Sequence, residues 1–173
     1  MLTEAQNRYG ERDLNYTILG IEFSPHGPQI WYPNSCKNII IQLSESAALS
    51  IERACYQLAH ECIHLLAPSG GRMANCLEEG IASVFAEDYI RKFGFTMKAG
   101  QREYQFVRDH TRDLLKFRES AVRDIRAIQP AMYKLTKEDI QKGVPEIPED
   151  LAALLASPFE KINELLPFQS YQR

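Results

Sequence analysis

The stretch 56–66 reads YQLAHECIHLL and contains the pattern His-Glu-x-x-His within a run of helix-forming residues. On an α-helix, residues four positions apart lie one above the other on the same face. The imidazoles of His60 and His64 can therefore reach a single ion, and imidazole nitrogen is a common zinc ligand. Glu61 is displaced by one residue, so it can reach a water molecule near that ion without binding the ion itself. The pattern predicts a metal-binding helix with a carboxylate base beside it.

The apolar residues of this helix test the alternative, which is an ordinary buried helix that happens to contain two histidines. They form a continuous stripe: Ile51, Ala54, Cys55, Leu58, Cys62, Leu65 and Leu66. At 100° per residue, His60 and His64 lie roughly opposite the centre of the stripe. Packing in the core therefore does not explain the two histidines, although a solvent-exposed polar face would.

The next predicted helix begins with two adjacent acids, in the segment 75–86, NCLEEGIASVFA. Asn75 followed three residues later by Glu78 is typical of a capping box, which gives Glu78 a structural task. Glu79 has no such task and shares its helix face with small residues, so another helix can approach it closely. A carboxylate on a largely buried helix needs a partner or a metal. Together with the two histidines, Glu79 completes the predicted ligand set of a Zn²⁺ ion with an open fourth position.

The two motifs, His60-Glu61-x-x-His64 and LEEGIAS over 77–83, resemble those of the gluzincin clan of zinc metallopeptidases. The resemblance covers about residues 38–90. It implies a zincin-like fold, hydrolysis of peptide bonds, the zinc ligands His60, His64 and Glu79, and a sheet above the cleft that binds extended substrates. It also implies a Tyr or His donor that stabilises the tetrahedral intermediate.

The chain departs from the clan at several points. Fourteen residues separate His64 from Glu79, a few fewer than in thermolysin or the large aminopeptidases, and Ser83 replaces the Asp that supports a ligand histidine in thermolysin-type enzymes. The Gly-x-Met-Glu-Asn signature of the aminopeptidases does not occur, so exopeptidase activity is not implied. Ala67 in place of Gly, with no third histidine, argues against a metzincin.

Two residues of a helix predicted over 101–128 are candidates for the donor, Tyr104 and His110. Tyr104 falls on the apolar stripe of that helix, where packing in the core is the alternative interpretation. His110 flanks the same stripe. Arg72, in the loop between the two metal-binding helices, is either a solvated cation or a partner for a substrate carboxylate.

The order of elements predicts an α+β fold, with a small antiparallel or mixed sheet followed by a helix-rich part, in one domain over 1–173. Short strands with tight connections at 16–23, 29–32 and 38–43 favour an antiparallel meander. Helices are expected at 3–8, from a cap at Ser44 or Ser46 to 66, at 75–93, at 101–128, from Thr136 and from Glu149 to about 155.

Composition excludes several classes of protein. The chain has 173 residues, 45% of them hydrophobic, and a formal net charge of −3, which does not indicate a nucleic-acid partner. No apolar run approaches the ~20 residues of a membrane span, and the polar start carries no secretory signal. Cys55 and Cys62 lie about 10 Å apart along one helix, too far for a disulfide. Free thiols, Cys36 and Cys76 included, favour the cytoplasm.

The leading hypothesis is a cytoplasmic zinc-dependent hydrolase, a peptidase acting on peptide or protein substrates. In this hypothesis zinc polarises the scissile carbonyl and Glu61 is the general base. An alternative is a zincin-like regulatory or binding module without turnover, whose cleft is closed by the C-terminal helices or filled by its own chain. A third is a structural helical protein without a metal. The sequence does not define the oligomeric state.

Overall fold

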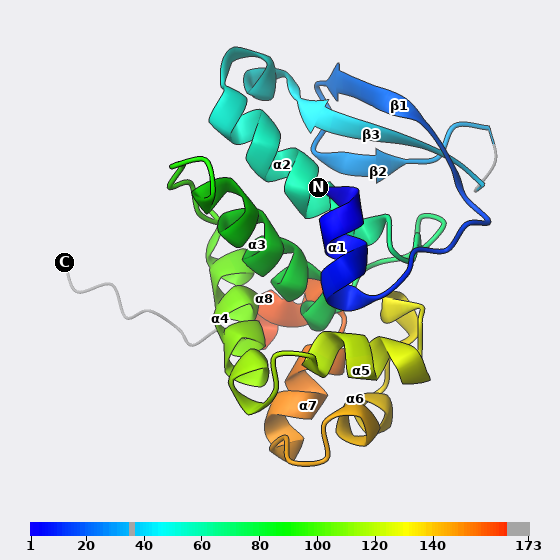
Figure 1. Ribbon diagram of the computed structural model, residues 1–173, viewed down its shortest axis with the longest axis vertical. Helices are drawn as coiled ribbons and strands as arrows, with labels where there is room; N and C mark the ends of the chain where they lie inside the picture. The colour runs from blue at the N-terminus through cyan, green and yellow to red at the C-terminus, as the bar shows by residue number, and fades with distance from the viewer. Residues whose placement is uncertain (35–36, 166–173) are drawn as a thin grey trace.

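The computed structural model describes residues 1–34 and 37–165 and has the α+β organisation expected from the sequence (Figure 1). A small sheet lies beside a group of packed helices. Its strands are β1 (Thr17–Ser24), β2 (Gln29–Trp31) and β3 (Asn38–Ser44). The α-helices are α1 (Leu2–Tyr9), α2 (Ile51–His64), α3 (Cys76–Arg91), α4 (Arg102–Phe117), α5 (Ala121–Ile128), α6 (Lys137–Gly143), α7 (Glu149–Ala156) and α8 (Ile162–Leu165).

The sheet is mixed, so the expectation of an antiparallel meander is wrong. The strand order is β1-β3-β2, with β1 parallel and β2 antiparallel to β3. The strand β3 takes the central position because it is the most apolar of the three: Ile39, Ile41 and Leu43 are buried against α2. The connection from β1 to β2 therefore spans the position of β3 instead of forming a hairpin.

The helix α2 begins later than its sequence pattern suggests. A 3₁₀ segment, Glu45–Leu49, follows β3, and Ser50 is the N-cap, its side chain accepting a hydrogen bond from the Arg53 amide at 3.3 Å. The predicted cap at Ser44 or Ser46 is wrong, because Ser44 hydrogen-bonds Gln57 of α2 instead. This contact ties the end of β3 to the helix that carries the histidines.

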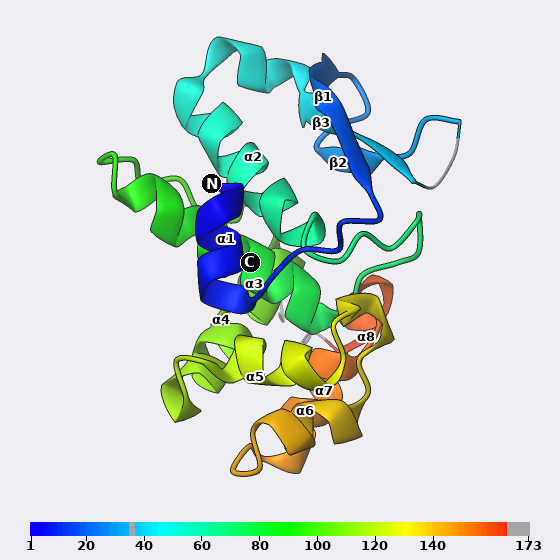
Figure 2. The ribbon, with the colours of Figure 1, turned by 45° about the vertical axis from the view of Figure 1, so that its right-hand side comes forward.

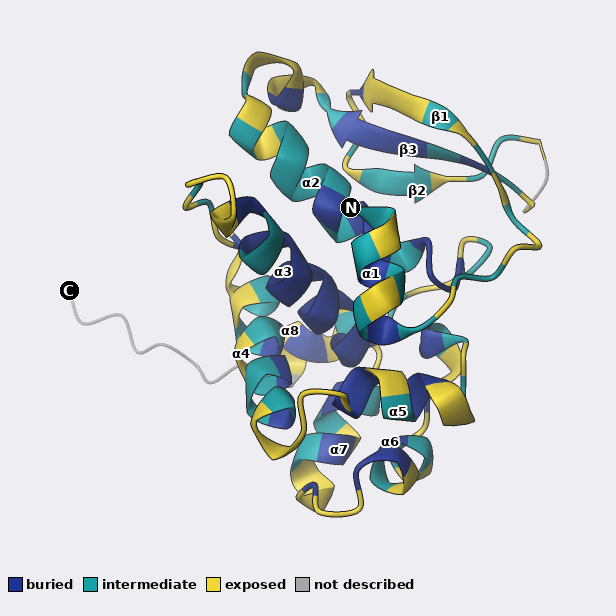
Figure 3. Ribbon diagram, in the orientation of Figure 1, coloured by how far each residue is buried: buried dark blue, intermediate teal, exposed yellow. Residues whose placement is uncertain are grey.

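The helix α3 is the most buried element of the fold (Figure 3). Asn75 caps it, accepting a hydrogen bond from the Glu78 amide at 2.9 Å. Gly80 allows α4 to approach closely, since a Cβ at this position would lie 2.0 Å from Thr111 Oγ1 and 2.7 Å from the Val107 carbonyl oxygen. The helix α3 is therefore held between α2 and α4.

The single helix predicted over 101–128 is two helices, α4 and α5. Val107, Thr111 and Leu114 form the buried stripe of α4, and the next position of that stripe is Arg118. Because this charged side chain cannot continue the stripe, residue 118 adopts an extended backbone and pairs with Asp124 at 3.2 Å. The chain turns there, and α5 packs separately against α6.

The helices α5, α6 and α7 lie at the end of the molecule away from the sheet (Figure 2). As predicted, a helix opens at Thr136 and another at Glu149; Thr136 caps α6 and forms a capping box with Asp139. None of the helices in the described part of the chain combines the length and apolar composition that crossing a bilayer requires. Cys55, Cys62 and Cys76 are free thiols, as expected, and Cys36 lies outside the described residues.

Arg126 of α5 connects three parts of the chain although only 6% of it is exposed. Its guanidinium donates hydrogen bonds to the carbonyl oxygens of Tyr9 at 2.6 Å, Gly10 at 2.8 Å, Glu11 at 2.8 Å and Leu66 at 3.3 Å. These acceptors belong to the end of α1, the loop after it and the end of α2. One buried side chain therefore donates to carbonyl groups near the ends of two helices, and it shares the Leu66 oxygen with the Asp13 amide.

We expect Arg126→Met to lower the free energy of unfolding by about 2–4 kcal/mol, because the carbonyl oxygens of Tyr9, Gly10 and Glu11 lose their guanidinium donor. Urea denaturation measures the change. The matched control is Arg123→Met on the exposed face of the same helix, which should shift stability by no more than about 0.5 kcal/mol. A loss below about 1 kcal/mol in Arg126→Met would show that water replaces the guanidinium.

Candidate metal centre

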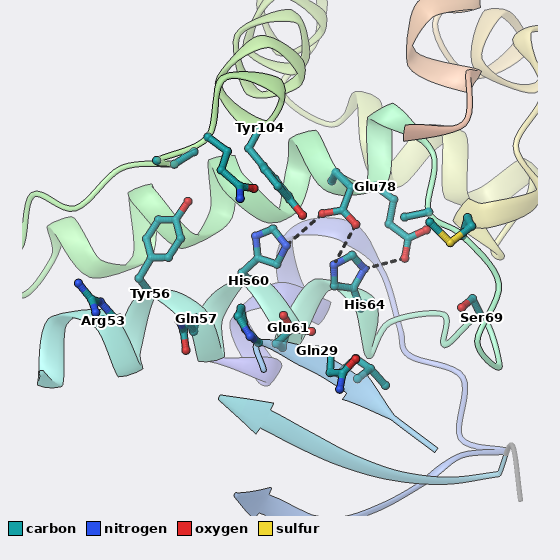
Figure 4. Close-up of a pocket in the computed structure, with 18 of the residues that line it drawn as sticks. Gln29, Arg53, Tyr56, Gln57, His60, Glu61, His64, Ser69, Glu78 and Tyr104 are labelled. Carbon is teal, nitrogen blue, oxygen red and sulfur yellow. Dashed lines mark hydrogen bonds and ion pairs between the residues drawn. The ribbon is translucent and has the colours of Figure 1, made fainter. Parts of the chain in front are cut away.

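Two turns of α2 present His60 and His64 toward α3, on the side away from the sheet (Figure 4). Their ring centroids lie 5.2 Å apart, and their side chains are only 13% and 16% exposed. Most apolar residues of α2 belong to the two buried clusters that it forms with the sheet and with α3. His60 and His64 lie outside these clusters and line a cavity. The position opposite the stripe is the one that the sequence predicts.

Glu79 lies between the two histidines. His60 Nε2 is 3.1 Å from Glu79 Oε2, and His64 Nε2 is 3.7 Å from Glu79 Oε1. One ligand atom from each residue falls within a mutual distance of 4.8 Å. Two ligands that bind one zinc ion tetrahedrally at about 2.1 Å lie about 3.4 Å apart, so the donors fit an ion of this size with little rearrangement.

Glu78 has a different task from the one expected. Its backbone amide completes the Asn75 cap, but its side chain does not return to Asn75: Oε1 accepts a hydrogen bond from His64 Nδ1 at 2.8 Å. The capping-box interpretation of this side chain is therefore wrong. Metal-binding histidines commonly donate their second ring nitrogen to a carboxylate, which fixes the ring orientation and raises its basicity. Glu78 is placed to do this for His64.

The two carboxylates change the proton affinity of the groups around them. Burial alone would lower the pKa of His64, but Glu79 and Glu78 outweigh it and raise the pKa to about 10. Burial alone would raise the pKa of Glu79, but the charge on His64 and the hydrogen bond from His60 bring it below its usual value. His64 and Glu79 thus stabilise each other's charge, so a cation that bound His64 would have to displace its proton.

Glu61 lines the cavity that His60, His64 and Glu79 also line, and it does not belong to the group of possible ligands. Only 3% of the residue is exposed, and burial raises the pKa of its carboxyl although the charges of His64 and His60 partly oppose the shift. A carboxylate with a raised pKa accepts a proton more readily at neutral pH. The spacing of His-Glu-x-x-His predicts that Glu61 lies beside the candidate ligands without being one, and its position agrees with this.

The structure brings Tyr104 to the site but not His110. The Tyr104 ring packs edge-on to His60, with centroids 5.9 Å apart, and its hydroxyl points into the cavity (Figure 4). Burial and the charges of Glu79 and Glu61 raise its pKa, so the hydroxyl stays protonated and is a donor. His110 does not line the cavity; its Nδ1 donates to the Phe106 carbonyl oxygen at 2.9 Å.

The cavity has a volume of about 810 Å³ and follows one face of α2. The residues that α2 contributes are Arg53, Tyr56, Gln57, His60, Glu61 and His64. From the first of these residues to the last there are eleven helical steps, or about 17 Å, which equals about five residues of an extended peptide. The strand β2, the loop before α3 and the loop before α4 form the other walls.

Sequence reasoning missed the loop 97–101, which supplies one of these walls. Glu52 holds it by accepting hydrogen bonds from the amides of Thr96 at 2.8 Å and Met97 at 2.7 Å, and buried Glu87 accepts from the Ala99 amide at 3.3 Å. No local pattern predicts these long-range contacts. For Arg53 and Gln57 a signal was present, since they continue the helix face of His60 and His64 at three- and four-residue spacing.

Comparison of the chain with protein-family models, with curated proteins and with solved structures finds no match.

The ligand geometry predicts that each imidazole is needed for the metal. His60→Ala and His64→Ala should yield largely metal-free protein, and Glu79→Gln should bind zinc more weakly, because two ligands cannot hold the ion as three do. Metal analysis of each purified variant after dialysis measures the occupancy. One zinc per chain in both alanine variants would show that the ligand set is wrong.

Glu78→Gln separates support of His64 from helix capping. The substitution keeps the backbone amide of residue 78, which Asn75 caps, but removes the negative charge next to His64. Zinc affinity should therefore fall about tenfold or more. Competition with a zinc indicator measures it, with exposed Glu119→Gln as the control. Unchanged affinity in Glu78→Gln would mean that this carboxylate does not tune the ligand.

Proposed function

We propose that the protein is a zinc-dependent hydrolase, and specifically a metallopeptidase. The observation that carries the proposal is the convergence of His60, His64 and Glu79 within 4.8 Å, with the buried carboxylate of Glu61 in the same cavity. Two imidazole nitrogens and one carboxylate oxygen are a ligand set of catalytic zinc sites that leave a coordination position open. The His-Glu-x-x-His sequence and its resemblance to gluzincins support the same assignment.

Zinc, when bound by these residues, supplies Lewis-acid chemistry: it polarises the scissile carbonyl and makes water a better nucleophile at neutral pH. Glu61 takes the proton from the attacking water as the C–O bond forms. It then delivers that proton to the amine nitrogen as the C–N bond breaks, so that the carboxylate is regenerated. The raised pKa of Glu61 suits both transfers.

Tyr104 is the donor that stabilises the oxyanion. Its hydroxyl is protonated, points into the cavity and comes from α4, a different element from those that carry the ligands. Its ring is fixed between His60 and Phe159, whose ring centroid lies 4.7 Å away. A donor held in this way gains more from a developing negative charge than from the neutral carbonyl.

The shape of the cavity favours a peptide over a small molecule. Its length along α2 suits about five extended residues, and β2 lies along one side. Among the described residues, those that line it fall between 28 and 104, so the C-terminal helices do not fill it. This supports turnover over the alternative of a zinc-binding module closed by its own chain. The free thiols support a reducing compartment such as the cytoplasm.

Glu61→Gln tests catalysis separately from metal binding. Zinc content and thermal stability should stay close to wild type, because the glutamine has the same size and Glu61 is not a ligand. Cleavage of a diverse peptide library, followed by mass spectrometry, should fall by about 10²–10⁴-fold. Loss of zinc would make Glu61 a ligand or a structural residue. Wild-type protein that holds zinc but cleaves nothing would favour the non-catalytic module.

A further inference from the structure

The charges on the cavity wall are unevenly distributed. Among the described lining residues, the carboxylates are Glu61, Glu78 and Glu79, all of which belong to the metal centre. The cations are Arg53, Arg72 and Lys98, which lie away from it. The acidic groups of the centre are offset by the imidazoles and, when present, the metal. The remainder of the wall therefore carries positive charge.

Two of these cations lie at the same end of the cavity. Arg53 precedes His60 by seven residues, or two helical turns, which places its Cα about 10 Å from His60 along α2 (Figure 4). Lys98 follows Met97, whose amide donates to the side chain of Glu52, the residue before Arg53. The loop 97–101 thus brings Lys98 to the N-terminal end of α2.

The charges at this end are available to a ligand. Within residues 1–34 and 37–165, no carboxylate pairs with the side chain of Arg53 or Lys98 within 4.0 Å, and both residues are exposed. The nearby Glu52 carboxylate is already occupied by two backbone amides, from Thr96 and Met97. Arg72, at the opposite end, is held by its own chain: it donates to the Tyr133 hydroxyl at 3.2 Å and lies over that ring.

We infer that the substrate is an acidic peptide whose carboxylate side chain binds Arg53 and Lys98. This inference rests on the proposed function, because it assumes a peptide lying along α2 past the metal centre. An extended chain advances about 3.3 Å per residue, so 10 Å corresponds to about three residues. The acidic side chain therefore lies about three residues from the bond that reaches His60 and His64. Gln57 and Gln101 provide neutral polar groups along the same path.

Charge at this end selects among peptides more than it adds to overall affinity. Both cations are exposed, so each contact with a carboxylate is partly screened by water and salt. Two cations acting together should favour an Asp peptide over its Asn analogue by about five- to tenfold at low ionic strength. The preference should shrink as salt is added, whereas contacts of neutral groups should not change in this way.

The test measures binding in a protein that does not turn over. Zinc-loaded Glu61→Gln protein is titrated into fluorescent peptides in which one Asp, or one Asn as the control, is moved along an otherwise neutral sequence. Fluorescence anisotropy should show tighter binding of the Asp peptide at one position. Arg53→Gln combined with Lys98→Gln, in the Glu61→Gln background, should abolish that preference. Arg53→Lys should keep it, as should Arg123→Gln, which removes an exposed cation outside the cavity.

Charge reversal gives the sharpest variant. Arg53→Glu with Lys98→Glu should favour Lys peptides over Asp peptides by about tenfold, and circular dichroism verifies that the variant is folded. An Asp preference that persists in the double glutamine variant, or no preference in Glu61→Gln, overturns the assignment of these two cations.

Wild-type cleavage of the same peptides separates this inference from the proposed function. Cleavage without a preference for Asp overturns the inference and leaves the metallopeptidase standing. Selective binding of Asp peptides without cleavage supports the acidic ligand and overturns the peptidase. Failure of every peptide to bind or to be cleaved overturns both.

Discussion

The pairing of two imidazoles on α2 with two carboxylates on α3 is the contact on which the rest of the structure depends. The side chains of His60, His64, Glu78 and Glu79 are largely buried, and an unpaired charge on any of them would be destabilising. The apolar surfaces of the two helices supply the driving force for their packing. The charged pairs then oppose sliding or rotation of the helices, because such a shift would separate Glu78 and Glu79 from the imidazoles. We propose that a metal bound here would reinforce the same register.

The other side of α3 repeats this arrangement with different residues. Glu87, two turns after Gly80, is 4% exposed and pairs with Arg108 at 2.8 Å and Arg112 at 3.1 Å, both on α4. It also accepts a hydrogen bond from Ala99 in the loop before α4. The helix α3 therefore contacts the histidines through Glu78 and Glu79 in its first turn, and it holds the wall of the cavity through Glu87 in its fourth. Because α4 carries Tyr104, the position of the proposed oxyanion donor depends on these same contacts.

The sequence predicted most strongly what arises from short-range patterns. The spacing of His60 and His64 and the apolar stripe of α2 depend on helix geometry alone. The structure brings the two histidines together with Glu79, as expected. The pairing of β3 with both other strands is not what the sequence predicts, because the short connections favour a meander, although Ile39, Ile41 and Leu43 make β3 the most apolar strand. The sequence predicts a capping box for the Glu78 side chain because that pattern is local. The contact with His64 that the structure shows arises only when α2 and α3 pack together. Arg118 is an exposed charged residue at the position where the buried stripe of α4 would continue, and the sequence periodicity beyond it favours one longer helix.

The order of residues along α2 links the proposed chemistry to the proposed selectivity. A helix offers a new side chain on the same face every three or four residues, so Arg53, Gln57, His60 and His64 form a row about 17 Å long. The row begins with an exposed cation and ends with histidines whose carboxylate partners come from another helix. In the proposed function, an extended peptide alongside this row would meet the charge before the candidate metal centre, at a distance that helix rise fixes. Lys98 adds to that charge from a loop whose position depends on Glu52, the neighbour of Arg53. Changes in substrate preference can therefore arise at the N-terminal end of α2 without disturbing the ligands two turns away.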